Sequence, residues 1–303
     1  MGLVEKTFKN GEVIIKEGDI GKSFFQLIDG SAFVYAGFGK NDQVKLAVLE
    51  PGEFFGEMAI LEAYPRSATV VAKGSVSVIE IPEDDMYDFL AEDPERITQL
   101  MTFLGYRVCA MAADYQESQV LLDELRASEE AKKNKSLFAK IKKHIDTYQS
   151  NKNKITEPDA DSLREELDKL KDDHTGNLKT YGKGLIIFKE GAVDNNMYIL
   201  HKGTVGMYNS YRRKEEEKLA EFNAVSFFGE LGIISDAPRG ATAVAEVPGT
   251  CIEIISQEDL EEIFRICPAK IIMILRHLSY RLRKINMDFL NTCKEITEIY
   301  NKK

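Results

Sequence analysis

Short runs of β-branched and aromatic residues alternate with turn residues over the first eighty positions of the chain. Gly, Asp and Asn interrupt these runs at intervals of about 8 to 12 residues, a spacing typical of a sandwich or barrel of short strands. A Pro51-Gly52 turn leads into the segment that contains Phe55. The expected strands are Val13–Ile15, Phe24–Ile28, Ala32–Tyr35, Lys45–Leu49, Ala68–Ala72 and Val76–Ile81.

The pattern then becomes helical. Apolar residues recur with alternating steps of 4 and 3 in two segments, which predicts long helices over Glu95–Ser128 and Ala269–Tyr300. A seam of about four heptads is longer than one small β domain needs to cover itself, so we expect the two helices to pair rather than to lie each on its own β domain. The seams are Ile97, Met101, Leu104, Val108, Met111, Tyr115, Ser118, Leu122 and Leu125, and Ile271, Leu275, Leu278, Leu282, Ile285, Phe289, Thr292, Ile296 and Ile299.

The chain contains an internal repeat. Phe55-Gly56-Glu57 recurs as Phe228-Gly229-Glu230, displaced by 173 residues, and the same displacement holds from Gly11 to Arg66. After Arg66 the displacement grows by one residue. A displacement this constant predicts two copies of one fold. The expected domains are residues 1–127, a connector at 128–177, and residues 178–303. Other matched pairs are Gly30 with Gly203, Pro65-Arg66 with Pro238-Arg239, and Tyr106-Arg107 with Tyr280-Arg281.

The connector has a composition of its own, dense in Lys, Glu, Asp and Asn. Pro158 separates two stretches with helical apolar spacing, which predicts a helical hairpin. Its lysines would suit an anionic surface or partner, but we favour a charged connector whose apolar stripe packs on a neighbouring domain. The apolar positions are Leu137, Phe138, Ile141, Ile145 and Tyr148, then Leu163, Leu167 and Leu170; the lysines are Lys132, Lys133, Lys135, Lys140, Lys142 and Lys143.

Composition narrows the location and the partners of the chain. The 303 residues carry a formal net charge of −10, which argues against nucleic acid as the main partner. No uncharged apolar run approaches the ~18 residues of a membrane span, and no apolar segment follows a basic start, as in a signal peptide. Lys6 stands where a myristoylation motif requires Ser or Thr. We therefore expect a cytoplasmic protein without a membrane span.

Neither catalysis nor a metal site is predicted. The four cysteines and the four histidines lack the spacings of metal or catalytic motifs. The segment Gly18–Ser23 ends like a nucleotide-binding P-loop, but Lys16 stands where the first glycine of that motif is required. We expect no catalytic residues, no metal and no cofactor, and hence a protein that is not an enzyme.

The most informative motif covers residues 55–69 and is repeated at residues 228–242. A glycine allows the backbone to approach a ligand, and the short apolar turn that follows offers backbone N–H groups to an anion. An arginine nine residues after the glutamate adds a positive charge and a planar fork of donors. The glutamate would repel the anion unless it accepted hydrogen bonds from hydroxyl groups. The motif therefore indicates a phosphorylated sugar or nucleotide.

These segments resemble the phosphate-binding cassette of the cyclic-nucleotide-binding domain family, which includes the catabolite activator protein, the protein kinase A regulatory subunits and the cyclic-nucleotide-gated channels. The resemblance covers about residues 5–127 and 178–302 and includes Lys16-Glu17-Gly18-Asp19. It implies an α+β fold: two β-roll (jelly-roll) domains, each followed by a long C-terminal helix, joined by a helical hairpin connector.

The resemblance also implies roles for single residues. Glu57 and Glu230 would accept the ribose 2′-hydroxyl, and Arg66 and Arg239 would pair with the cyclic phosphate. Backbone N–H groups near both ends of each cassette would bind phosphate oxygens. The implied ligand-binding residues are Gly56, Glu57, Met58, Ala59, Arg66, Ser67 and Ala68 in the first copy, and Gly229, Glu230, Leu231, Gly232, Arg239, Gly240 and Ala241 in the second.

The implied ligand is cAMP, with cGMP as the second candidate. Some family members with a hydroxyl directly after the cassette arginine accept cGMP. Ser67 supplies such a hydroxyl and Gly240 does not, so the two sites are expected to differ in selectivity. The chain has no Trp to cover the base. An aromatic lid would have to come from residues that packing explains equally well: Tyr106, Tyr115, Tyr280 or Phe289.

In the relatives, the ligand repositions the C-terminal helix, so we expect control of an unidentified effector protein through these helices. No helix-turn-helix or kinase-docking segment is expected beside the two domains. The helices would pair either as an intramolecular pseudo-dimer or in a homodimer. The pseudo-dimer is favoured because the connector is long enough to return along a helix of ~45 Å. The alternatives are a structural scaffold with non-functional pockets and a DNA-associated transcriptional regulator that uses the basic connector.

Overall fold

The computed structural model describes residues 4–40, 43–57, 66–127, 135–151, 177–224, 226–234 and 237–301. It divides into two compact units. The first comprises Met1–Phe89, Arg107–Pro158 and Ser279–Lys303, and the second comprises Leu90–Tyr106 and Asp159–Leu278. Each unit therefore contains one β region together with segments of the long helices.

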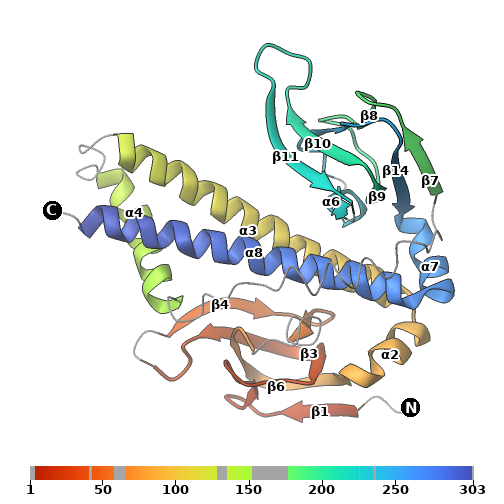
Figure 1. Cartoon of the computed structure of the whole chain (residues 1–303). Helices are drawn as coiled ribbons and strands as arrows, with labels where there is room; N and C mark the ends of the chain where they lie inside the picture. Colours follow the sequence, from red (N-terminus) through yellow and green to blue (C-terminus); the bar gives the residue numbers. More distant parts are fainter. Residues whose placement is uncertain are drawn as a thin grey trace. The chain divides into compact units, whose positions relative to one another are not determined.

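The β region of the first unit is an antiparallel sheet ordered β1-β6-β3-β4, with β2 on β6 and β5 on β3 (Figure 1). The predicted strands Phe24–Ile28 and Ala32–Tyr35 form one continuous strand. Gly30, with φ of +85°, lies where the register of that strand shifts, and glycine adopts this conformation without a steric cost. The strands are β1 (Val4–Phe8), β2 (Val13–Ile15), β3 (Ser23–Ala36), β4 (Val44–Leu49), β5 (Phe54–Phe55) and β6 (Thr69–Pro82).

The second unit repeats these strands, with the two long ones divided. Its sheets are ordered β11-β10-β13-β8 and β12-β9-β14-β7. Gly203, with φ of +95°, separates β9 from β10 at the position that matches Gly30. The strands are β7 (Asn177–Tyr181), β8 (Ile186–Phe188), β9 (Asn196–Lys202), β10 (Thr204–Asn209), β11 (Glu217–Asn223), β12 (Ser226–Phe228), β13 (Thr242–Ala245) and β14 (Thr250–Ser256).

The two β regions bury matching cores, as the repeat predicts. Phe25 stacks on Phe55 at 5.2 Å between ring centroids, and Tyr198 stacks on Phe228 at the same separation. Burial of these apolar side chains drives the folding of each copy. The core of the first copy contains Phe25, Leu27, Ala32, Leu49, Phe55, Val70, Ala72, Val76 and Val78. That of the second contains Phe188, Tyr198, Leu200, Val205, Phe228, Ala243 and Ile252.

The two long helices are confirmed almost to the residue, as α3 (Glu95–Ala127) and α8 (Pro268–Asn301). α8 begins with Pro268, whose fixed φ and missing N–H suit the first position of a helix. Shorter helices precede them: α2 (Met86–Glu92) before α3, and α7 (Leu260–Ile266) before α8. A single turn, α6 (Leu231–Ile234), follows β12.

Within the first unit, α3 and α8 contact each other directly. Nε2 of Gln119 donates a hydrogen bond to Oγ1 of Thr292 at 2.9 Å, and Arg126 forms an ion pair with Glu295 at 2.5 Å. Both residue numbers rise together along the contact, so these parts of the helices run parallel. Leu121, Leu122, Leu125 and Ile296 are buried in one apolar cluster, against which Ile299 and Tyr300 pack.

The first helix of the connector, α4 (Lys135–Asn151), packs on α3 and α8 in the same unit. Ile141 is buried in the apolar cluster of these helices, with Ile145 against it. Lys140 pairs with Glu117 at 3.0 Å and Lys143 with Asp114 at 3.6 Å, both on α3. The apolar stripe of α4 therefore packs on neighbouring helices, as favoured from the sequence. The second predicted stretch, with Leu163, Leu167 and Leu170, lies outside the described residues, as do Lys132 and Lys133.

Candidate functional site

The guanidinium of Arg66 is buried next to the turn that follows β5, with 6% of the residue exposed. Its Nη1 donates to the carbonyl oxygen of Gly56 at 2.5 Å, and its Nη2 donates to that of Ser23. Gly56 has φ of +79°, and a Cβ there would lie 2.5 Å from Nη1, so glycine is required. Burial lowers the pKa of Arg66, and the charge of Glu57 is the largest effect that opposes the decrease. Arg66 still supplies positive charge, since arginine stays protonated in proteins.

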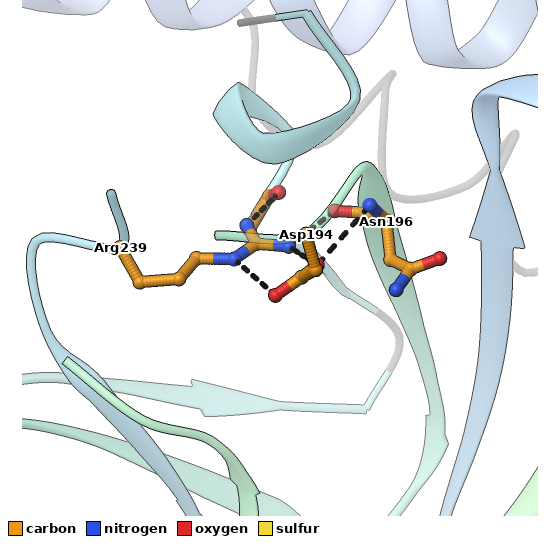
Figure 2. A network of polar contacts seen from close by, with 4 residues as sticks. Asp194, Asn196 and Arg239 are labelled. Carbon is orange, nitrogen blue, oxygen red and sulfur yellow. Dashed lines mark hydrogen bonds and ion pairs between the residues drawn. The ribbon is translucent and has the colours of Figure 1, made fainter. Parts of the chain in front are cut away.

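Arg239 holds the matching place in the second copy, and it also contacts a carboxylate. Its Nη1 donates to the carbonyl oxygen of Gly229 and its Nη2 to that of Asn196, both at 2.6 Å. Its Nε donates to Oδ2 of Asp194 at 3.1 Å, and Nη2 also donates to Oδ1 of the same residue (Figure 2). Burial raises the pKa of Asp194, but the hydrogen bond and charge of Arg239 outweigh this effect and leave the pKa below its usual range. Asp194 is therefore ionised near neutral pH.

Aromatic rings lie beneath both guanidinium groups. The Cζ of Arg66 lies 5.9 Å from the ring centroid of Phe25. The Cζ of Arg239 lies 4.5 Å from the centroid of Phe188 and 5.5 Å from that of Tyr198. Such contacts stabilise a partly desolvated cation. Burial raises the pKa of Tyr198 to about 12, so this ring stays neutral. No local pattern in the sequence predicts this role for the aromatic residues, although the repeat aligns Phe25 with Tyr198.

The two cassette glutamates are buried. Glu57 is 2% exposed, and its Oε1 accepts a hydrogen bond from Nη1 of Arg107 on α3 at 2.6 Å. Its Oε2 is buried and accepts no hydrogen bond from the residues that the structure describes. Glu230 is 0% exposed, directly before α6. Sequence reasoning missed the contact of Arg107, although the matched pair Tyr106-Arg107 had marked this position as part of the repeat.

The other predicted site residues lie around these side chains. The N–H of Gly232 donates to the carbonyl oxygen of Gly229 at 3.1 Å, so part of this turn is closed by its own backbone. Leu231 is half-buried and Gly232 is buried. After the arginines, Ser67 and Gly240 are exposed, Ala68 is half-buried and Ala241 is buried. Met58 and Ala59 lie outside the described residues.

Packing accounts for one of the aromatic residues considered as a lid. Phe289 is 6% exposed, and its ring meets that of His144 on α4 edge-on at 5.9 Å between centroids. Tyr106 is 69% exposed on α3. Phe289 therefore belongs to the packed helices of the first unit, whereas Tyr106 is free to meet solvent.

Neither a membrane-spanning helix nor a cluster of metal-binding side chains is present in the part of the chain that the structure describes. No helix there is long and apolar enough to cross a membrane. No group of three or more His, Cys, Asp or Glu side chains there could hold a metal ion.

Comparisons with known proteins bear on both repeats. The model of the family "Cyclic nucleotide-binding domain" matches residues 5–93 and 178–266, more than half of the chain. The cAMP-dependent protein kinase regulatory subunit of Blastocladiella emersonii is 25% identical over 83% of this chain and 50% of its own length. The cGMP-dependent protein kinase of Plasmodium berghei is 46% identical over 26% of this chain and 8% of its own length.

A solved structure of cAMP-bound PfPKA-R is 18% identical, covers 88% of this chain and 74% of that chain, and has a TM-score of 0.36. The chain thus spans half the length of the Blastocladiella relative and a small part of the Plasmodium kinase.

Proposed function

Because the chain belongs to the cyclic nucleotide-binding domain family and carries two copies of the domain, we propose that each copy binds a cyclic nucleotide and that binding controls a separate effector protein. This agrees with the resemblance found in the sequence. The residues proposed to hold the ligand are the cassette residues around Glu57 and Arg66 and around Glu230 and Arg239.

The observation that carries the proposal is the pair of buried arginines on matching backbone carbonyls. Arg66 and Arg239 each donate from Nη1 to the carbonyl oxygen of a glycine ten residues earlier. A buried cation needs an anionic partner, because removing a charge from water is costly. Arg239 already pairs with Asp194, whereas Arg66 forms no ion pair within the described structure, so this argument applies most directly to Arg66. A guanidinium also suits phosphate oxygens in particular, because its N–H donors form a planar fork.

The buried Oε2 of Glu57 supports the sugar part of the proposed ligand. A buried carboxylate oxygen without a hydrogen-bond donor is unfavourable. A ribose hydroxyl would supply that donor. Since Oε1 already accepts from Arg107 on α3, a ligand on Glu57 would act on a residue of the long helix. We infer that this contact couples the cassette to α3 and that ligand binding shifts the helix between two states.

We infer that cAMP is the main ligand and cGMP the second. The similarity to a cAMP-dependent kinase regulatory subunit supports cAMP, and the similarity to a cGMP-dependent kinase supports cGMP. Because curated relatives include regulatory subunits, we also infer a non-catalytic role, in the cytoplasm. The contact of α3 with α8 supports pairing of the helices within one chain rather than in a homodimer.

Thermal unfolding of the full chain with cAMP or cGMP tests the proposal. A ligand at 100 times its Kd stabilises the native state by about 2.7 kcal/mol, which raises Tm by a few degrees. We expect a smaller shift for Arg66→Ala or Arg239→Ala than for the wild type, and no shift for the double variant. Arg265→Ala, an exposed site on α7, should behave like the wild type.

Three results would contradict the proposal. Folded protein whose Tm neither nucleotide changes would favour a scaffold with non-functional pockets. A cyclic-nucleotide shift that persists in the double variant would place the ligand away from the two arginines. Tight binding of DNA with a steep salt dependence would instead favour the transcriptional regulator.

A further inference from the structure

The two repeats differ at one position beside the cassette arginine, where the first has a glycine and the second has an aspartate. Gly21 lies beside Arg66, and a Cβ at Gly21 would lie 2.1 Å from Nη2 of that arginine. The residue 173 positions later is Asp194, whose carboxylate contacts Nε and Nη2 of Arg239. In the first copy, the guanidinium lies against bare backbone. In the second copy, it faces a negative charge.

The repeats also differ at a second position beside the arginine. A Cβ at Gly232 would lie 2.3 Å from Nη2 of Arg239, so this arginine needs the glycine on its α6 side. The residue that matches Gly232 in the first copy is Ala59, which has a Cβ. Besides the shared cassette glycine, Gly56 or Gly229, each repeat therefore leaves space for its arginine with one further glycine, Gly21 in the first copy and Gly232 in the second. Asp194 and Gly232 both lie against Arg239, so the two differences from the first repeat concern the same side chain.

The donors of the two arginines are used to different extents. A guanidinium has five N–H donors. Arg239 uses four of them: two on Asp194 and one each on the carbonyl oxygens of Gly229 and Asn196. Among the described residues, Arg66 uses two, on Gly56 and Ser23. A phosphate could therefore receive a two-donor contact from Arg66 without replacing any partner, but not from Arg239.

Direct pairing with a carboxylate also distinguishes the two arginines among the described residues. The Arg239 side chain is 5% exposed and that of Asp194 24%, so solvent screens this ion pair only in part. A cyclic phosphate at Arg239 would meet an ion pair whose charges cancel, and the carboxylate of Asp194 would lie close to the phosphate. The charges of Glu57, Glu80 and Asp19 also act on Arg66, but within the described structure its guanidinium donates only to backbone carbonyl oxygens, so the other donors of Arg66 remain open to a phosphate.

Resting on the proposed function, we propose that Asp194 competes with the ligand's phosphate for Arg239, so that the second site binds cyclic nucleotide more weakly than the first and fills after it. Asp194 is then a residue that determines the affinity of one site. The first site has no counterpart, since Gly21 carries no side chain.

Calorimetric titration of the full chain with cAMP tests this inference one site at a time. Arg66→Ala disables the first site and reports the second. Adding Asp194→Asn keeps the shape of the side chain and removes its charge. We expect cAMP to bind this double variant at least about tenfold more tightly than Arg66→Ala alone, about 1.4 kcal/mol. The matched control is Asp19→Asn in the Arg239→Ala chain, where we expect less than about a twofold change.

The outcomes separate the inference from the proposed function. Unchanged or weaker binding by Asp194→Asn would show that Asp194 positions Arg239 for the ligand, and the inference would be wrong. The same holds if Arg66→Ala binds cAMP as tightly as Arg239→Ala does. If the folded wild type binds neither cAMP nor cGMP, the proposed function itself fails. Should Asp194→Asn not fold, Asp194→Gly, which copies the first repeat, replaces it in the same titration.

Discussion

The amide Nε2 of Gln119 on α3 donates a hydrogen bond to Oγ1 of Thr292 on α8, at 2.9 Å. Thr292 is the polar position in the seam of α8, and Ser118 is its counterpart in the seam of α3. Both are buried, at 4% and 0% exposure. A buried hydroxyl in an apolar seam needs a partner, and the facing helix of the same chain supplies one for Thr292. The C-terminal parts of the two long helices thus contact each other within the first unit.

This contact predicts that the chain is a monomer in solution. Because the C-terminal part of α3 packs on α8 in one apolar cluster, this part of the seam is not available to a second copy. We expect sedimentation equilibrium to give a mass near 34.2 kDa over protein concentrations that span about two orders of magnitude. A mass of twice that value at the lowest concentration would instead support a homodimer through these helices.

Breaking the buried ion pair of the second unit should strongly destabilise the protein. Nζ of Lys270 lies 2.9 Å from Oε1 of Glu253, and both side chains are at most 1% exposed. The other carboxylate oxygen of Glu253 lies 2.7 Å from Nε2 of His201. Lys270→Met leaves a buried carboxylate without its cation, so we expect the free energy of unfolding to fall by about 3–5 kcal/mol.

Urea unfolding monitored by circular dichroism measures this loss. The control is Arg265→Met, which removes an ion pair with Glu262 whose side chains are 75% and 69% exposed. An exposed pair contributes about 0–1 kcal/mol. Equal losses in the two variants would mean that burial does not decide the value of the Lys270 pair.

Stability should fall as the pH is lowered from 6.5 toward 4, in part because of His277. This half-buried side chain lies beside the ring of Phe227, and desolvation lowers its pKa from the ordinary 6.5 to about 4. Between these values the unfolded chain binds a proton that the native state does not, so the native state loses stability as the pH falls. The loss is about 3 kcal/mol once the pH is below both pKa values.

The urea midpoint, measured from pH 7.5 to 4.5, isolates this contribution when wild type and His277→Gln are compared. Their stabilities should converge as the pH falls, because only the wild type loses stability through His277. Parallel curves would show that His277 does not titrate differently in the native and unfolded states.

A hydroxyl after the second cassette arginine should change ligand preference. Gly240 is exposed, and no atom lies within 4 Å of a Cβ placed there, so Gly240→Ser fits without displacing a neighbour. With the first site disabled by Arg66→Ala, we expect this variant to bind cGMP several-fold more tightly relative to cAMP, by analogy with Ser67. Ser67→Ala in the Arg239→Ala chain should shift the ratio the other way. A ratio that moves in neither chain would rule out a role for this hydroxyl in selectivity.

Local patterns were sufficient to predict the repeat, most strands, the bounds of the long helices and the positions of both cassette arginines. These features depend on residues close together in the chain: the period of apolar side chains, the turn glycines, and the separation of nine positions from Glu57 to Arg66. The long strand β3 is a partial exception, because a glycine at positive φ that looks like a break can also lie within a continuous strand.

The partners of the site residues were decided only by the tertiary structure. Asp194 meets Arg239 across 45 positions of the chain, Arg107 meets Glu57 across 50, and Gln119 meets Thr292 across 173. No local period encodes such contacts, since they depend on how strands and helices pack in three dimensions. The repeat aligns Gly21 with Asp194, but only the folded chain brings that carboxylate to one of two otherwise equivalent arginines.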